Sequence, residues 1–157
     1  MPTLFMFCGL PGSGKTTLAK RLEHGRSALR LDPDEWMCRI IGDGYDAAKR
    51  AAVHAVQWGI AARVLGLGVD VVLEFGFFRR RERDDYRARA AALGAEIQLC
   101  FLDVPREELL RRLAARNANL PPATFHVSED LLDECISWFE PPTSDEFEPA
   151  SARNTVE

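Results

Sequence analysis

The sequence lacks the features that mark membrane proteins, secreted disulfide-rich proteins and zinc proteins. It has no apolar run that approaches the ~20 residues of a membrane-spanning helix. It opens on a strand-like apolar stretch without a basic n-region, so we expect no signal peptide. Its four cysteines lie at least 30 positions apart and include no C-x-x-C pair. We therefore expect free thiols, in a cytoplasmic protein.

An excess of positive charge is also missing. The 157 residues carry 20 Lys and Arg against 24 Asp and Glu, which gives a formal net charge of −4. This balance argues against a large nucleic-acid surface, although it is compatible with a local basic groove. The 46% of hydrophobic and 28% of charged residues are ordinary for a globular protein, and the length fits one domain with a proper core.

Short apolar runs alternate with segments of helix-forming residues along most of the chain. The apolar runs predict β-strands at residues 3–8, 28–32, 70–75 and 96–104. Glycine, proline and acidic residues at the boundaries predict helices at residues 15–24, 33–41, 46–65, 80–93, 105–116 and 128–139. This alternation predicts a three-layer α/β/α fold, in which helices cover both faces of a parallel sheet of four or five strands.

The composition changes towards the end of the chain. We expect one domain over residues 1–139, with a short lid near residues 117–127, where a proline-containing loop separates two helices. From residue 140 onwards Pro, Ser, Asp and Glu dominate, which indicates a loosely ordered tail over residues 140–157.

The stretch "CGLPGSGKTT" interrupts the regular pattern between the first strand and the first helix. It matches G-x-x-x-x-G-K-[ST], in which flexible glycines let backbone N–H groups converge on a phosphate. Lys15 would neutralise the β- and γ-phosphates of ATP, and the Thr16 hydroxyl would complete a Mg²⁺ shell. A glycine-rich turn without a ligand is the alternative, but the strand before and the helix after favour a phosphate site. The predicted nucleotide-binding residues are Gly9, Leu10, Pro11, Gly12, Ser13, Gly14, Lys15, Thr16 and Thr17.

Two carboxylates follow the second predicted strand, in "RLDPDEW". Asp32 and Asp34 flank a proline at the carboxyl end of a strand, which is the edge where such sheets bind ligands. One carboxylate can accept the proton of a substrate hydroxyl while the other orients metal-bound water. The alternative is a helix N-cap followed by an acid in the first turn, and we expect Asp32 to cap as well.

Two arginines precede the predicted lid. "LLRRLAARN" places Arg112 and Arg116 one helical turn apart, so both can swing onto ATP when the loop closes. A solvated helix face is the alternative. A small kinase needs such arginines, a metal ion and a base for the acceptor hydroxyl. The N-K-x-D element of a GTPase is absent, and the chain is too short for an oligomeric AAA-type motor.

These motifs resemble one broad group of proteins. "GLPGSGKTTLAKRL", the acidic end of the second strand and "FLDVPREELLRRLAAR" are similar to the nucleoside-monophosphate-kinase-like P-loop kinases, which have an AAA-type ATP-binding domain. The group includes adenylate, gluconate and shikimate kinases, chloramphenicol phosphotransferase, zeta toxins and polynucleotide 5′-kinases. The resemblance covers residues 3–116. It implies that Arg112 and Arg116 are lid arginines, that Asp34 is the general base, and that Arg39 supplies an acceptor-side arginine, here at longer spacing.

The acceptor end departs from the pattern of this group. Nucleotide kinases often carry D-G-F-P-R after the third strand, where this chain reads "LEFGFFRR". Glu74 would then fill the acidic role and Arg79 or Arg80 the basic one; a strand-end acid paired to an arginine is the alternative for Glu74. Trp36, just after "DPD", is the tryptophan we expect to line an acceptor pocket, and packing in the core is the alternative.

An arginine-rich segment, "FRRRERDDYRARA", covers residues 78–90. It could hold a polynucleotide or a phosphorylated acceptor. We favour the other interpretation, a helix surface with Arg–Glu and Arg–Asp pairs.

We therefore expect a kinase that uses ATP and Mg²⁺ to phosphorylate a hydroxyl of a small molecule, as a monomer or homodimer and without a membrane. Two alternatives remain open: a polynucleotide 5′-hydroxyl kinase, and an ATP-binding regulatory or NTPase module without kinase activity. The predicted catalytic residues are Asp34, Asp32, Lys15, Arg112 and Arg116. The predicted acceptor-site residues are Trp36, Arg39, Glu74 and Arg79, and the predicted metal ligands are Thr16 and Asp32.

Overall fold

A computed structural model describes residues 1–147 of the chain. Four parallel strands form one sheet in the order β2-β3-β1-β4. They are β1 (Thr3–Cys8), β2 (Leu29–Leu31), β3 (Val71–Gly76) and β4 (Glu96–Phe101). The predicted parallel sheet is therefore confirmed with four strands, and residues 1–147 contain no fifth.

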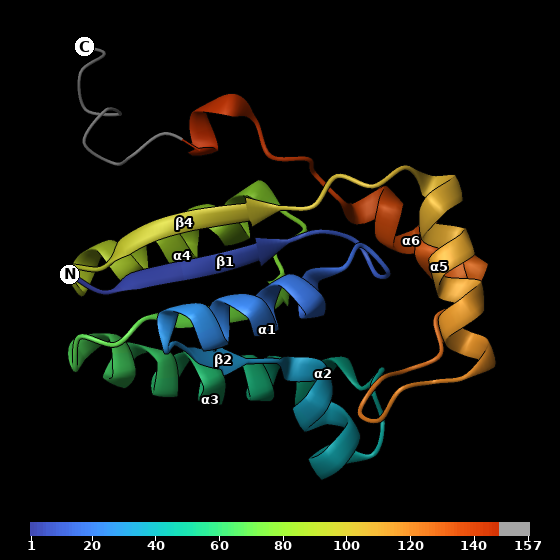
Figure 1. The fold of residues 1–157 in the computed structure, drawn as a ribbon, viewed down its shortest axis with the longest axis horizontal. Helices are drawn as coiled ribbons and strands as arrows, with labels where there is room; N and C mark the ends of the chain where they lie inside the picture. The colour runs from blue at the N-terminus through green and yellow to red at the C-terminus, as the bar shows by residue number, and fades with distance from the viewer. Residues whose placement is uncertain (148–157) are drawn as a thin grey trace.

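The helices lie in two layers around this sheet and in a third group at its end (Figure 1). They are α1 (Lys15–Arg26), α2 (Pro33–Trp36), α3 (Ala47–Gly66), α4 (Arg80–Ala92), α5 (Arg106–Ala118) and α6 (Glu129–Trp138). The helix expected at 33–41 is divided: α2 continues into a π-helical turn, η1 (Met37–Ile41), which closes where Gly42 N–H donates to Met37 O at 2.8 Å. No helix within residues 1–147 is long and apolar enough to cross a bilayer.

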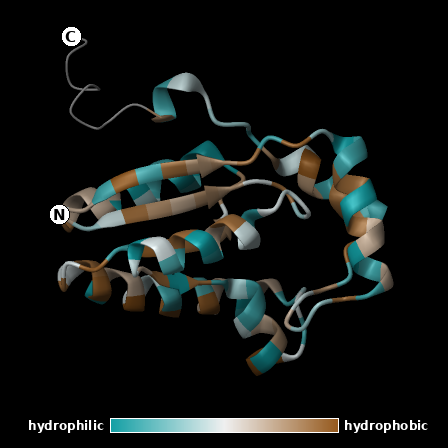
Figure 2. Cartoon of the chain, viewed as in Figure 1, coloured by the Kyte–Doolittle hydropathy of each residue, from teal (hydrophilic) through white to brown (hydrophobic). Residues whose placement is uncertain are grey.

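The central strand β1 supplies core residues to both faces of the sheet, and all six of its residues are buried. Successive side chains of a strand point to opposite faces. Leu4 and Met6 therefore pack towards α3 and α4, whereas Phe5 and Phe7 pack towards Ala19 of α1. This arrangement is the predicted three-layer α/β/α fold, and Figure 2 shows the hydrophobic residues gathered in its sheet.

Helices α5 and α6 form a hairpin at the carboxyl-terminal end of the sheet (Figure 1). Leu109, Leu113 and Leu132 bury their side chains in a separate cluster, against which Leu10 packs. The loop between the two helices, the segment predicted as a lid, reaches the turn before α3. There Tyr45 donates a hydrogen bond from its hydroxyl to the carbonyl of His126.

The chain after α6 returns across the end of α4. Glu140 N–H donates to Phe78 O at 2.7 Å, and a short 3₁₀ helix, η2 (Ser144–Phe147), places Glu146 in a buried position beside α4. Residues 140–147 thus differ from the loose tail expected from their composition, because they supply the acidic partners of arginines on α4. The rest of the predicted tail, residues 148–157, lies outside the described residues.

Two glycine substitutions should change stability in opposite directions. Gly59 lies inside α3 with open space where a Cβ would be, so Gly59→Ala should raise the free energy of unfolding by about 0.5–1 kcal/mol. Gly76 has φ +81°, and an added Cβ would lie 3.1 Å from Phe78 Cε1, so Gly76→Ala should lower it by about 1–2 kcal/mol. Urea unfolding of both variants measures the difference; equal effects would contradict the described turn.

Candidate active site

The predicted P-loop connects β1 to α1 at the carboxyl-terminal edge of the sheet. Gly12 and Gly14 have φ values of +82° and +94°, a backbone conformation that side chains disfavour. A Cβ on Gly12 would lie 3.0 Å from Cγ of Leu113, so the loop also packs too closely on α5 to accept a side chain there. The motif therefore has the backbone conformation and the packing that its glycines predict.

Two polar side chains of this loop, Lys15 and Ser13, can donate hydrogen bonds to a bound anion. Lys15 Nζ donates to Gly9 O at 2.6 Å and to Leu10 O at 3.1 Å, both main-chain carbonyls of the loop itself. Burial lowers the pKa of Lys15, against the raising effects of Asp34 and Glu74. Ser13 Oγ is buried and has no hydrogen-bond partner within the described residues. A phosphate bound in this loop would give these donors the acceptors that suit them.

The second residue of α1 faces an acid on β3. Thr16 Oγ1 donates to Glu74 Oε1 at 2.7 Å, and the side chain of Glu74 is almost fully buried. A hydroxyl and a carboxylate are oxygen ligands of the kind that Mg²⁺ prefers. The structure thus pairs Thr16 with Glu74, whereas the sequence analysis paired it with Asp32. Residues 1–147 contain no cluster of three or more His, Cys, Asp and Glu side chains that would by itself form a cation site.

Arg30 on β2 connects the acids of the site and was missed by the sequence analysis. Its Nη1 lies 2.6 Å from Glu74 Oε2 and 3.7 Å from Asp32 Oδ2, and its Nε lies 3.2 Å from Glu23 Oε2. Glu74 is therefore paired to an arginine, as the alternative for this residue predicts, and its role in the acceptor site stays a prediction. One signal was available: Arg30 and Asp32 are two positions apart in an extended segment, formed by β2 and the residue after it, so they project to the same side.

Asp32 caps the next helix and carries the most perturbed carboxyl group near the P-loop. Its Oδ1 accepts a hydrogen bond from the Asp34 N–H at 2.9 Å, so the predicted N-cap is present. Burial, followed by the negative charges of Glu74 and Asp34, raises the pKa of Asp32 to about 7. The group therefore changes its protonation state near neutral pH.

Asp34 is exposed and faces α3. Arg50 Nη1 lies 2.8 Å from Asp34 Oδ1, and Arg50 Nη2 donates to Gly44 O at 2.8 Å. One helical turn further along α3, His54 stacks on Phe75 with the ring centroids 4.2 Å apart. Burial and the charge of Arg50 lower the pKa of His54 to about 4. Helix α3 therefore places two polar side chains, Arg50 and His54, on the side that Asp34 faces. The sequence analysis identified neither of these two residues.

The two predicted lid arginines both project from α5 towards the site. Arg112 Nη1 lies 3.5 Å from Gly12 O and 3.4 Å from Ser13 O. Arg116 Nη2 donates to Phe125 O at 3.4 Å, and its buried Nε has no partner within the described residues. Burial lowers the pKa of Arg116, and the nearby carboxylate of Asp34 opposes this shift. Arg112 therefore reaches the P-loop, and Arg116 reaches the lid loop.

Three predicted acceptor-site residues are not brought together with these groups. Trp36 is half-buried and packs against the core of the sheet. Arg39, on the π-helical turn, is exposed and pairs with Glu35 at 3.2 Å. Arg79 is exposed at the start of α4, where it lines a surface hollow with Arg81, Glu82 and Asp85. The arginine beside Asp34 is Arg50, which lies 16 positions along the chain from it.

The raised pKa of Asp32 yields a direct test. Because the charge of Glu74 helps to raise it, Glu74→Gln should lower the pKa of Asp32 from about 7 towards its ordinary 3.8, as followed by carbon NMR of the carboxyl group. In the wild type, the folded state binds more protons than the unfolded state between these values. The Asp32 contribution to the free energy of unfolding therefore falls as the pH rises through this window. Glu107→Gln, an exposed acid on α5, is the control; an unchanged Asp32 pKa in Glu74→Gln would contradict the described cluster.

A family model described as an AAA domain matches residues 4–142 of the chain. Among curated proteins, the bifunctional enzyme NodQ of Azospirillum brasilense is 32% identical over 117 residues. That match covers 71% of this chain but only 18% of the relative, so the chain corresponds to a small part of that protein.

Solved structures share the fold at low sequence identity. A chain of the Pnkp1/Rnl/Hen1 RNA repair complex superposes with a TM-score of 0.77 and 19% identity, over 94% of this chain and 47% of that one. Kti12 of Chaetomium thermophilum, in complex with ADP-AlF3, gives a TM-score of 0.69 at 18% identity and covers 89% and 81% of the two chains. A gluconokinase of Sinorhizobium meliloti gives 0.63 at 19% identity and covers 92% and 78%. The chain thus belongs to the AAA domain family, and its fold is the three-layer α/β/α P-loop NTPase fold.

Proposed function

We propose that this protein transfers the γ-phosphoryl group of ATP to a hydroxyl group of a small molecule. One observation supports the proposal most strongly: the threonine of the P-loop, Thr16, donates a hydrogen bond to the buried carboxylate of Glu74 at 2.7 Å. A phosphate-binding loop, a carboxylate beside its threonine and an exposed carboxylate for the acceptor are the parts that phosphoryl transfer requires.

The nucleotide end consists of the P-loop and its neighbours. Main-chain N–H groups of the loop would hold the phosphates, and Lys15 would exchange its carbonyl partners for phosphate oxygens. Thr16 and Glu74, already 2.7 Å apart, would hold Mg²⁺, which would neutralise charge on the phosphates. Asp32 stays a candidate ligand of water around this ion, because its pKa of about 7 permits the ionised form near neutral pH.

At the acceptor end, Asp34 is the residue best placed to act as the base. Its carboxylate is exposed, whereas Asp32 and Glu74 are largely buried. The carboxylate would accept the proton as the acceptor oxygen attacks the γ-phosphorus, while the bond from this phosphorus to the bridging oxygen breaks and ADP leaves. Arg50 would keep this carboxylate oriented, and His54, which is neutral at physiological pH, would offer the acceptor a polar but uncharged neighbour.

The lid arginines would act on the transferred group. Negative charge spreads over the equatorial oxygens of the phosphoryl group during transfer, and positioned arginines stabilise it. Arg116 suits this role because its guanidinium is partly buried and makes one long hydrogen bond, to Phe125 O. Arg112 would support the phosphates from beside Ser13.

The arginine-rich helix α4 bears on the polynucleotide alternative. Arg83 and Arg87 are buried against Glu146, and Arg80 pairs with Asp145 at 2.7 Å. These three arginines are therefore engaged within the protein, and the exposed Arg79 and Arg81 lie beside the acids Glu82 and Asp85. Little of the positive charge of this segment is left for a phosphate backbone, which favours a small acceptor. The likeness to an RNA repair protein at 19% identity concerns the fold.

A screen of hydroxyl compounds with γ-labelled ATP tests the proposal. We expect phosphoryl transfer to a small acceptor, loss of the calorimetric heat of Mg·ATP binding in Lys15→Ala, and a turnover reduced by about 10²–10⁴ in Asp34→Asn with ATP affinity retained. Labelling of a 5′-hydroxyl oligonucleotide, weakened by salt, would instead support the polynucleotide alternative. Binding of ATP without transfer to any compound would support a regulatory module.

Variants of two arginines on α5 distinguish a catalytic role of an arginine from a general effect of surface charge. Arg116→Gln should lower kcat by about 10²–10³, the usual effect of removing one donor to a developing charge. Arg111→Gln is the matched control, because its side chain is 71% exposed and pairs with Glu108. Steady-state kinetics of both variants provides the comparison, and equal kcat values would remove Arg116 from the proposed mechanism.

A further inference from the structure

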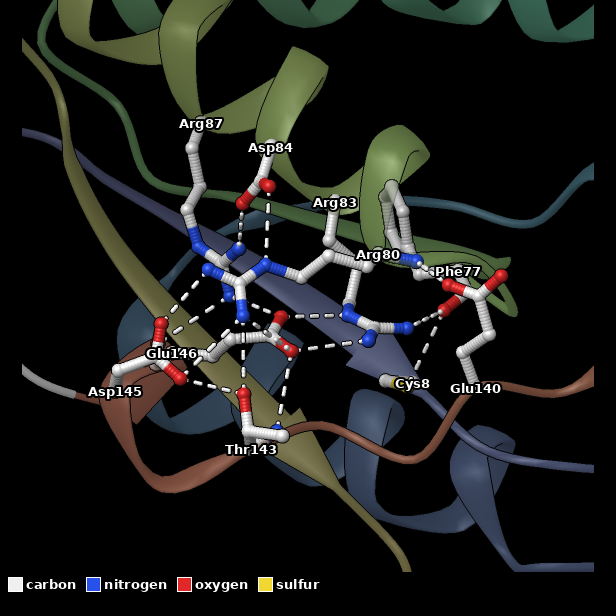
Figure 3. A network of polar contacts seen from close by, with 10 residues as sticks. All are labelled: Cys8, Phe77, Arg80, Arg83, Asp84, Arg87, Glu140, Thr143, Asp145 and Glu146. Atoms are coloured by element: carbon white, nitrogen blue, oxygen red, sulfur yellow. Dashed lines mark hydrogen bonds and ion pairs between the residues drawn. The ribbon is translucent and has the colours of Figure 1, made fainter.

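Helix α4 and the C-terminal segment, residues 140–147, share a buried network of ion pairs that the proposed reaction does not use (Figure 3). Arg83 Nε lies 2.7 Å from Glu146 Oε2, and its Nη2 lies 3.0 Å from Oε1, so the two side chains meet through two parallel bonds. Both side chains have no exposed surface, and Arg87 adds a bond of 2.9 Å to Oε2. Two-pronged pairs of this kind fix orientation as well as charge.

The Arg83 guanidinium also binds the turn at the end of β3, which consists of Gly76 and Phe77. Its Nη1 donates to Phe77 O at 2.8 Å. Gly76 and Phe77 have φ values of +81° and +50°, so the turn contains two successive left-handed residues, and the second is not glycine. A bulky residue is strained in this conformation and keeps it only where its surroundings enforce it. The hydrogen bond from Arg83 is one such constraint.

The same turn contacts the first residues of the P-loop. Gly9 N–H donates to Gly76 O at 3.2 Å, and the thiol of Cys8 donates to Phe77 O at 3.4 Å (Figure 3). Glu74, which accepts from Thr16, lies only two residues before the turn. The position of the turn therefore determines how the start of the P-loop and the carboxylate on β3 face one another.

We propose that Glu146 is a positioning residue for the P-loop and for Glu74, and that it acts through Arg83 and the turn of Gly76 and Phe77. The effect on catalysis rests on the proposed function; the effect on the turn does not. Glu146 keeps Arg83 directed at the Phe77 carbonyl, because an arginine buried without a carboxylate would otherwise be drawn to other acceptors.

The side chain of Glu146 carries a negative charge around neutral pH. Its burial alone would raise its pKa, but hydrogen bonds from Arg83 and Arg87 outweigh this effect and lower the pKa to about 2. The carboxylate therefore stays ionised around neutral pH.

Attachment of the C-terminal segment and control of the turn involve different contacts. Asp145 also ties this segment to α4, through Arg80 at 2.7 Å, but this pair is half-exposed. Arg80 lies 3.6 Å from Glu146 Oε1 as well, yet within the described residues it makes no hydrogen bond to the Phe77 carbonyl. Asp145→Asn therefore weakens the attachment without touching Arg83, and it is the matched control for Glu146→Gln.

The experiment compares these two variants in the full chain, well below their unfolding temperatures. In Glu146→Gln, we expect the amide hydrogen of Gly9 to exchange with solvent about tenfold faster by NMR. We also expect the Kd of ADP with Mg²⁺ to rise about tenfold by calorimetry, in the range usual for residues that support a binding group. Asp145→Asn should leave both quantities at their wild-type values. Glu146→Asp, which keeps the charge, should lie closer to wild type than Glu146→Gln.

The outcomes of this experiment test the role of Glu146 and the proposed function separately. A lower unfolding temperature in Glu146→Gln with unchanged Gly9 exchange and unchanged ADP affinity would reduce Glu146 to a purely structural role and overturn the proposal. Wild-type protein that binds no ADP would overturn the proposed function, while Gly9 exchange would still report whether Glu146 controls the turn. If Glu146→Gln does not fold, the same two measurements on Glu146→Asp decide. Because the shorter side chain cannot keep both bonds to Arg83 in place, we expect both quantities to rise by less than tenfold, and values equal to wild type would overturn the proposal.

Discussion

The contact of Glu74 with Arg30 is the interaction on which the site depends. A carboxylate that is almost fully buried is costly unless it is paired and hydrogen-bonded, and Glu74 receives both the Arg30 guanidinium and the Thr16 hydroxyl. Because these partners come from β2 and α1, the pair ties the outer strand and the phosphate-binding helix to β3. The same negative charge helps to raise the pKa of Asp32, so one ion pair sets both the geometry and the protonation of the acidic edge.

Features that depend on neighbouring residues could be predicted from the sequence. The bounds of β1, the P-loop, the N-cap at Asp32 and the order of strands and helices all follow from local patterns, and the structure contains them. The projection of Arg112 and Arg116 towards one region follows from their spacing on α5. Short-range backbone geometry and helical periodicity suffice for such features.

Features that depend on the angles between elements could not be predicted. The partner of Asp34 is Arg50 on another helix, whereas Arg39, chosen for its nearness in the sequence, is turned to the surface by the π-helical turn. In the same way, the sequence predicts Arg–Glu and Arg–Asp pairs on the surface of the arginine-rich helix. Such pairs are present, as between Arg89 and Asp85, but two of the six arginines are buried, because an acidic residue 63 positions from Arg83 returns to them.

The strand order leaves β4 at one edge of the sheet. The backbone N–H and C=O groups on the outer side of an edge strand are unpaired, and they can pair with a strand of another chain. The short helix η2 contacts β4 and lies beyond it at that edge (Figure 1). The segment that carries η2 thus covers part of this edge, and we expect a chain shortened before residue 140 to leave more of β4 open to pairing with neighbouring molecules.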